Sequence, residues 1–256
     1  MYNDLFSIGP VTIHGYGLMI GIGFIVGLFV GDWLAKKKGI DGDHVFSLAI
    51  WILILGFLAG KLLFIITIIP DIIAGNATLG QIGNGFVVYG GIIAALPIGL
   101  IYCKRKKISF LSMGDCIAPA TAVVQGFGRI GCFLAGCCWG READPDKEPY
   151  IIFTHSDYAP NGIPLIPTQL YSSALNFLNF VLLYIIFKKE KNEGEAFACY
   201  VINYAIGRFI IECFRDDPRG SVGVLSTSQF ISIFMLAFGI WFLVFVKRRG
   251  EHKKSL

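Results

Sequence analysis

The feature that most constrains this chain is a series of seven apolar stretches, each about the length of a helix that crosses a membrane. A helix rises about 1.5 Å per residue, so about 20 apolar residues span a hydrocarbon core about 30 Å thick. Of the 256 residues, 55% are hydrophobic and only 16% are charged, which is more apolar than a water-exposed surface allows. The sequence therefore predicts an all-α, polytopic membrane protein with about seven transmembrane helices.

We expect a single transmembrane domain over residues 1–256. The first stretch lacks a basic flank and a small-residue cleavage site, so it is interpreted as a retained helix rather than a signal peptide. Three segments, 71–85, 139–168 and 214–225, lie outside the membrane, and the middle one is long enough to form a small lid. The helices are predicted over residues 11–34, 45–69, 86–103, 113–138, 169–187, 196–213 and 226–246.

Basic residues gather at alternate helix ends, and this pattern predicts the orientation of the chain. Four clusters, near residues 36–38, 104–107, 188–191 and 247–254, hold 15 of the 22 Lys and Arg residues. Because loops on the cytoplasmic side of a membrane carry an excess of Lys and Arg, the four clusters are assigned to that side. The N-terminus is then outside and the C-terminus cytoplasmic, as in a multi-pass protein of the inner (cytoplasmic) membrane. Contact with lipid head groups explains the net charge of +4, and no nucleic-acid partner is indicated.

Charged side chains inside membrane helices are costly, so each one needs a partner or a function. Tyr204, Arg208, Glu212 and Arg215 follow at spacings of four, four and three, which predicts one polar helix face. Two interpretations stay open. Arg208 and Glu212 neutralise each other as an ion pair, or Arg208 also binds an anion such as a lipid phosphate.

Two further cations are predicted within the membrane. Arg129, in the segment QGFGRIGCFLAGCCWG, has no acidic residue within one helical turn. It therefore requires an anionic ligand or a carboxylate from another helix, for which Glu212 and Asp115 are candidates. Lys61 has a flexible stem that can carry its ammonium group to the membrane surface, so snorkelling explains it as well as ligand binding does.

Seven cysteines are present, and Cys132, Cys137 and Cys138 cluster near the outer end of the fourth predicted helix. They fit either as small buried residues that fill space or as a thiol relay. The four histidines do not lie at metal-ligand spacing, so we expect no metal and no cofactor.

Several short motifs, taken together, resemble the prolipoprotein diacylglyceryl transferase family. They are HGYGLM, VVYGG at 87–91, GRIGCFLAGCCWG, PTQLYS at 167–172, GRFIIECFR and LSTSQ at 225–229. The resemblance extends from Pro10 to the last predicted helix. Members of that family move the diacylglyceryl group of phosphatidylglycerol onto the lipobox cysteine thiol of a prolipoprotein precursor and release glycerol phosphate.

The resemblance implies roles for individual residues. Arg129 and Arg208 correspond to a clamp for the phosphate, and Tyr16 to a functional tyrosine that can hydrogen-bond the head group; Tyr16 also fits as an ordinary interfacial aromatic residue. Tyr89 stands at the position of a catalytic histidine. The full candidate set is Arg129, Arg208 and Tyr89 as catalytic residues, with Tyr16, Gly90, Gly91, Cys132, Glu212 and Lys61 as substrate-binding residues. The implied partners are phosphatidylglycerol, prolipoprotein precursors and membrane lipids.

The chain also departs from the family pattern. Besides Tyr89, Cys132 and Ala135 stand where asparagines are usual, Cys137 replaces a glutamate, and Lys61 and Phe64 replace an arginine and a tyrosine. A phenol is a weak base at neutral pH, so the thiol-activating half of the site is less well kept than the phosphate-binding half. The alternatives are activation by the arginines or Glu212, a different acceptor, a covalent cysteine intermediate, a lipid-binding protein without chemistry, and a thiol redox protein.

Overall fold

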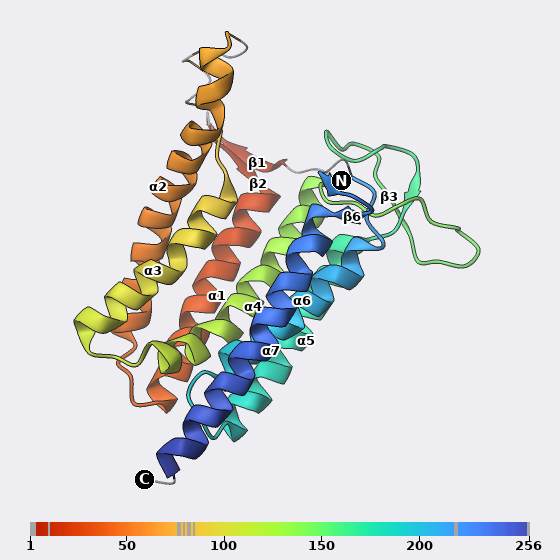
Figure 1. Cartoon of the computed structure of the whole chain (residues 1–256). Helices are drawn as coiled ribbons and strands as arrows, with labels where there is room; N and C mark the ends of the chain where they lie inside the picture. The colour runs from red at the N-terminus through yellow and green to blue at the C-terminus, as the bar shows by residue number, and fades with distance from the viewer. Residues whose placement is uncertain are drawn as a thin grey trace. The chain divides into compact units, whose positions relative to one another are not determined.

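A computed structural model describes residues 4–9, 11–75, 78, 80, 83, 85–217 and 220–254. Within these residues the chain forms seven helices and three two-stranded antiparallel sheets (Figure 1). The helices are α1 (Gly15–Lys37), α2 (Asp43–Ile73), α3 (Val88–Lys106), α4 (Phe110–Ala135), α5 (Thr168–Lys189), α6 (Glu195–Glu212) and α7 (Thr227–Lys254). The strands are β1 (Asp4–Ile8), β2 (Val11–His14), β3 (Ile151–Ile152), β4 (Pro164–Leu165), β5 (Ser221–Val222) and β6 (Leu225–Ser226). Pro10 and parts of the segments 71–85 and 214–225 lie outside the described residues.

The helices confirm the all-α polytopic class. In the described part of the chain, α1, α2, α3, α4, α5 and α7 are long and apolar enough to cross a membrane. The remaining helix, α6, has 18 residues and is the shortest of the described helices, and Arg208 and Glu212 lie in its last two turns. The chain is thus a multi-pass membrane protein.

The first helix begins later than the sequence predicts. Residues Val11–His14, placed in the helix by their apolarity, form strand β2 instead, paired antiparallel with β1 from Ile8↔Val11 to Asp4↔His14. Val11, Thr12 and Ile13 are β-branched, which favours a strand. Gly9 supplies the positive φ, 60°, of the turn between the strands. The predicted helix 11–34 is corrected to Gly15–Lys37.

The chain divides into two compact units, Met1–Gly31 with Gly114–Leu256 and Asp32–Met113. In the first unit, α6 packs against both α5 and α7. The N-terminal part of α1 lies on α4, where a Cβ atom on Gly23 would come within 2.7 Å of Phe127 Cβ. In the second unit, α2 packs against α3. The single domain over residues 1–256 stays a prediction.

The segment 139–168 has a small core of its own. Phe153, Ala159 and Leu165 are buried together, and Trp139 and Ile151 pack against them. Strands β3 and β4 pair across this core. The Arg141 N–H donates to the Phe214 carbonyl over 2.9 Å, so the segment is tied to the chain that follows α6. The predicted lid is therefore a folded element fixed beside the end of α6.

Candidate active site

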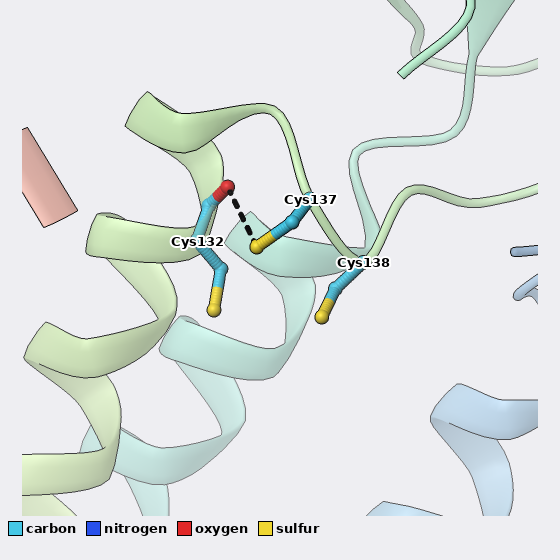
Figure 2. A group of neighbouring side chains, drawn as sticks. All are labelled: Cys132, Cys137 and Cys138. Atoms are coloured by element: carbon cyan, nitrogen blue, oxygen red, sulfur yellow. Dashed lines mark hydrogen bonds between the residues drawn. The ribbon is translucent and has the colours of Figure 1, made fainter. Parts of the chain in front are cut away.

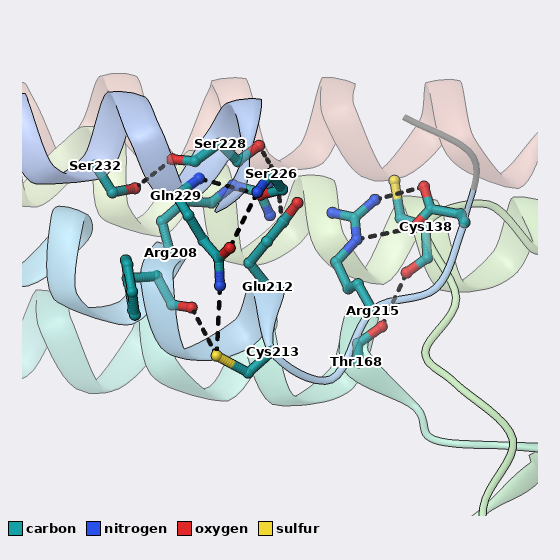
Figure 3. Close-up of polar contacts among 12 residues, drawn as sticks. Cys138, Thr168, Arg208, Glu212, Cys213, Arg215, Ser226, Ser228, Gln229 and Ser232 are labelled. Carbon is teal, nitrogen blue, oxygen red and sulfur yellow. Dashed lines mark hydrogen bonds and ion pairs between the residues drawn. The ribbon is translucent and has the colours of Figure 1, made fainter. Parts of the chain in front are cut away.

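The charged face of α6 is built around Arg208. Its Nη2 atom donates to Ser228 Oγ of α7 over 2.7 Å and pairs with Glu212 Oε2 at 3.0 Å, as Figure 3 shows. The Arg208 side chain is 16% exposed and the Glu212 side chain is 4% exposed. The helical spacing of four residues brings the two charges together, so the predicted Arg208–Glu212 ion pair is formed.

The ion pair does not use all of the Arg208 donors. The Nη1 atom is buried and has no hydrogen-bond partner among the described residues. A buried donor without a partner costs about 1–3 kcal/mol. The ion pair with Glu212 thus accounts for Nη2 and leaves Nη1 available for an anionic oxygen.

A small, partly open pocket lies beside this arginine, within the first unit. It is lined from α4, α5 and α6, by Arg129, Ser172, Leu175, Asn176, Asn179, Asn203, Tyr204, Gly207, Arg208 and Ile211. Asn203 Nδ2 donates to Asn179 Oδ1 over 2.9 Å, which links α6 to α5 at the pocket wall. The structure therefore brings Arg129 and Arg208 to one polar pocket between apolar helices.

Arg129 is half-buried on α4 and has no hydrogen bond or ion pair to any residue in the described part of the chain. The two carboxylates considered as its partners have other contacts. Glu212 pairs with Arg208. Asp115 accepts hydrogen bonds from the Gly194 and Phe197 N–H groups, at 2.6 and 3.0 Å, and thereby caps the first turn of α6. An anionic ligand is left as the natural partner of Arg129.

Arg215 belongs to a different group of contacts. Helix α6 ends at Glu212, so the predicted extension of the polar face to Arg215 is wrong: Arg215 lies in the turn beyond the helix. It forms two hydrogen bonds to Asp217, at 3.0 and 2.8 Å, with 5% of its side chain exposed. Its role is to fix the chain after α6, close to Cys138 (Figure 3).

The three outer cysteines meet because of the way α4 ends. The Gly136 N–H donates to the Phe133 carbonyl over 3.2 Å and the Cys137 N–H to the Cys132 carbonyl over 3.1 Å. This is a Schellman motif, with Gly136 at a φ of 73°. The predicted helix 113–138 is therefore corrected to Phe110–Ala135, and the reversal of the chain places Cys137 over Cys132.

Cys138 completes the cluster, and the three Sγ atoms lie within 4.8 Å of one another (Figure 2). Hydrogen bonds with Cys132 and Cys137 lower the pKa of the Cys138 thiol, and Arg215 and Arg129 lower it further. The same thiol contacts raise the pKa of Cys137. The three thiols therefore interact directly with one another.

Tyr16 lies in the first turn of α1, with 41% of its surface exposed. A Cβ atom on Gly131 of α4 would come within 3.1 Å of the Tyr16 carbonyl oxygen and 3.2 Å of its ring. The small residue at position 131 therefore admits Tyr16 close to the helix that carries Arg129 and Cys132.

The other predicted site residues belong to the second unit, Asp32–Met113. Lys61 Nζ donates to the carbonyls of Gly83 and Gly85, at 2.9 and 3.0 Å. Its charge is thus satisfied by the backbone that precedes α3, which is a structural role. Tyr89 lies in the first turn of α3 and is 50% exposed.

Gly90 and Gly91 allow α3 to approach α2 closely. A Cβ atom on Gly90 would lie 2.5 Å from the Ala59 carbonyl oxygen, and one on Gly91 would lie 3.1 Å from the Gly56 carbonyl oxygen. Any larger residue at position 90 would push the helices apart. Helix packing is therefore sufficient to explain the glycine at position 90.

Several polar residues of the site were not among those predicted. Asn176, Asn179 and Asn203 line the pocket, while Thr168 and Gln169 bind the carbonyls of Cys138 and Cys137 over 2.9 and 2.8 Å. Uncharged polar residues are common in membrane helices and give only a weak signal in a single sequence. The available signal was that Asn176 and Asn179 lie three residues apart, on one face of a single helix.

The fold and the pocket define a class: a polytopic α-helical membrane protein with two arginines that line one pocket between helices. The family model for prolipoprotein diacylglyceryl transferase matches residues 3–245. A phosphatidylglycerol–prolipoprotein diacylglyceryl transferase of Clostridium tetani is 48% identical over 239 residues, covering 93% of this chain and 94% of the relative.

Two further relatives extend the comparison. Phosphatidylglycerol–prolipoprotein diacylglyceryl transferase 2 of Clostridium perfringens is 42% identical over 243 residues, with 94% of each chain covered. The corresponding transferase of Staphylococcus xylosus is 30% identical over 252 residues, covering 97% of this chain and 90% of the relative. The chain belongs to the prolipoprotein diacylglyceryl transferase family, as the motifs predicted.

Proposed function

We propose that this membrane transferase moves the diacylglyceryl group of phosphatidylglycerol onto the lipobox cysteine of a prolipoprotein. In this reaction the acceptor sulfur forms a bond to the glyceryl carbon that bears the phosphate. The carbon–oxygen bond to the phosphate breaks, glycerol phosphate leaves with the bonding electrons, and the acceptor thiol loses its proton. The product is a thioether.

The observation that carries the proposal is the unpaired Nη1 of Arg208 in a pocket that also contains Arg129. Phosphate oxygens accept strong hydrogen bonds from guanidinium groups. Charge grows on the phosphate as the carbon–oxygen bond breaks, and fixed donors in a poorly hydrated site stabilise that charge more than mobile water does. Arg129 and Arg208 are therefore assigned to the leaving group.

The neighbouring residues hold the clamp in place. Ser228 and Glu212 fix the Nη2 side of Arg208, which leaves Nη1 for the ligand. Tyr16 and Cys132 lie on the parts of α1 and α4 nearest Arg129, and we assign them to the lipid head group. By family resemblance, Tyr89 is assigned to the catalytic residues and Gly90, Gly91 and Lys61 to substrate contacts, while the contacts of Gly90 and Lys61 also support a structural role.

Ionisation of the acceptor thiol is assigned to the positive field of the arginines, and the departing glycerol phosphate takes up the proton. Glu212 was the alternative, but its carboxylate is already paired with Arg208. A positive field stabilises a thiolate, and the thiolate is the nucleophile in thiol chemistry. The charge of Arg129 and Arg208 thus serves both the leaving group and the attacking sulfur.

The proposed setting is the inner (cytoplasmic) membrane, with the N-terminus outside and the C-terminus cytoplasmic. The basic helix ends support this orientation, because they gather at the ends that the positive-inside bias assigns to the cytoplasm. Phosphatidylglycerol and prolipoprotein precursors are the proposed substrates, among other membrane lipids, and nucleic acid is not a proposed partner.

The function is tested by incubating the purified protein with phosphatidylglycerol and a lipobox peptide, while peptide mass and released glycerol phosphate are followed. We expect a diacylglyceryl mass increase that is lost in Arg129→Ala and in Arg208→Ala. Arg141→Ala is the matched control, because Arg141 lies in the 139–168 segment and pairs with Glu148.

Three results would count against the proposal. A mass increase that persists in both Arg129→Ala and Arg208→Ala would refute the assignment of these two arginines as the phosphate clamp. Phosphatidylglycerol that binds without any mass increase would indicate a lipid-binding protein or another acceptor. A covalent adduct that is lost when Cys132, Cys137 or Cys138 becomes serine would indicate a cysteine intermediate.

A further inference from the structure

The three thiols at the end of α4 form a cluster of which the proposed transfer reaction uses only Cys132. Their Sγ atoms lie within 4.8 Å of one another, and they come from a helix turn and from the two residues that follow its C-terminal cap. Zinc–sulfur bonds are about 2.3 Å long. Three sulfurs around one such ion are therefore about 3.8–4.0 Å apart, which a small side-chain rotation reaches from the observed arrangement.

We propose that Cys132, Cys137 and Cys138 bind a thiophilic metal ion of the zinc or copper(I) class. Sulfur donors select these ions, whereas magnesium and calcium prefer oxygen. The prediction of no metal rested on the linear spacing of the histidines, and that spacing gives no information on the Schellman turn that brings the three thiols together.

The backbone holds the site in shape before an ion arrives. Cys138 has a φ of 61°, in the left-handed region that residues with side chains seldom occupy. Buried side chains from the first turn of α5 fix this conformation: Thr168 Oγ1 donates to the Cys138 carbonyl, and Gln169 Nε2 donates to the Cys137 carbonyl. Strained backbone that its surroundings fix in this way is typical of functional sites.

A direct contact within the cluster also holds the sulfurs together. The Cys137 thiol donates to the Cys132 carbonyl over 3.7 Å (Figure 2). The cluster is partly exposed rather than closed off, so an ion can enter. Three protein donors leave a fourth position open to an external ligand, as in zinc sites that bind a substrate or water.

The proposal goes beyond the transferase reaction, and its test uses no activity measurement. The full-length protein in detergent is titrated with cadmium(II) as a spectroscopic probe, and bound zinc and copper are measured by mass spectrometry. We expect about one ion per chain, as for a single thiolate site, with a sulfur-to-cadmium charge-transfer band in the ultraviolet. Magnesium should not compete.

Cys132→Ser and Cys138→Ser should each abolish the band, whereas Cys213→Ser should keep it. Cys213 is the matched control because it is exposed and lies at the end of α6. Should a variant fail to fold, the wild-type protein still decides: bound zinc must protect the three clustered cysteines, and not Cys213, from maleimide. Absence of the band, a band that survives both substitutions, or a disulfide within the cluster of the freshly purified protein would each overturn the proposal.

Discussion

Replacement of Arg208 by lysine separates the two tasks of this side chain. In the structure Nη2 is engaged by Ser228 and Glu212, while Nη1 has no partner in the described part of the chain. A lysine has one nitrogen in place of the planar fork. It can remain with Glu212 or reach toward the pocket, but a single ammonium group cannot hold both geometries at once.

The cost follows from the lost contact. A hydrogen bond to a charged group contributes about 1.5–3 kcal/mol, and about 1.36 kcal/mol corresponds to a tenfold change in rate. We therefore expect Arg208→Lys to lower kcat/KM for diacylglyceryl transfer about 10- to 150-fold. The net charge of the pocket is unchanged, so this loss reports geometry rather than charge.

Arg129→Lys provides the comparison, because Arg129 has no structural partner within the described residues and a lysine there keeps its nitrogen for the ligand. The assay measures initial rates of glycerol phosphate release at several phosphatidylglycerol concentrations. The expected order of activity is wild type, then Arg129→Lys, then Arg208→Lys. The reasoning is refuted if Arg208→Lys keeps wild-type kcat/KM, or if Arg129→Lys is the more damaged variant.

Three further predictions concern the supports of the site. Asp115→Ala should destabilise the protein by about 1–3 kcal/mol in a thermal or chemical unfolding assay, because two N–H groups of the first α6 turn lose their acceptor; an unchanged midpoint would contradict this. Gly136→Ala should cost about 1–2 kcal/mol by the same assay, since position 136 has a positive φ and a Cβ atom there would clash with Ser156; a neutral result would argue against the turn. The Arg141 hydrogen bond, with help from the Asp144 N–H, lowers the pKa of Glu148, so its stabilisation is present above the usual carboxyl pKa and lost as pH falls through the lowered value. The difference in unfolding temperature between wild type and Glu148→Gln should therefore shrink on acidification, and a constant difference would contradict the assignment.

The helices could be predicted because apolar length is a local property of the sequence. Seven transmembrane helices were predicted and seven helices form in the described residues; six of them are long and apolar enough to cross a membrane, and the seventh is α6. The ends of the helices were less predictable. Val11–His14 is apolar enough to extend α1, but it pairs with β1 instead. Strand pairing depends on a second segment of the chain, and the hydropathy of one segment gives no information about its partner.

The candidate site was predictable to the extent that it depends on charge. An arginine within an apolar segment is costly wherever it lies, so Arg129 and Arg208 stood out before any geometry was known. The asparagines of α5 and α6 carry no such signal, and only the packing of these helices brings Asn179 to Asn203. The sequence thus identified the two arginines one by one, whereas the pocket that they share depends on how the helices pack.

The two halves of the site depend on different kinds of support. The phosphate half rests on side chains locked by partners, since Arg208 is held by Ser228 and Glu212 before any lipid binds. Such preorganisation reduces the reorganisation needed as charge develops on the leaving group. In the proposed reaction the attacking thiol depends on that same arginine field, because Glu212 is already paired with Arg208. We therefore expect the conservative replacement of Arg208 by lysine to lower lipid turnover before it lowers lipid binding.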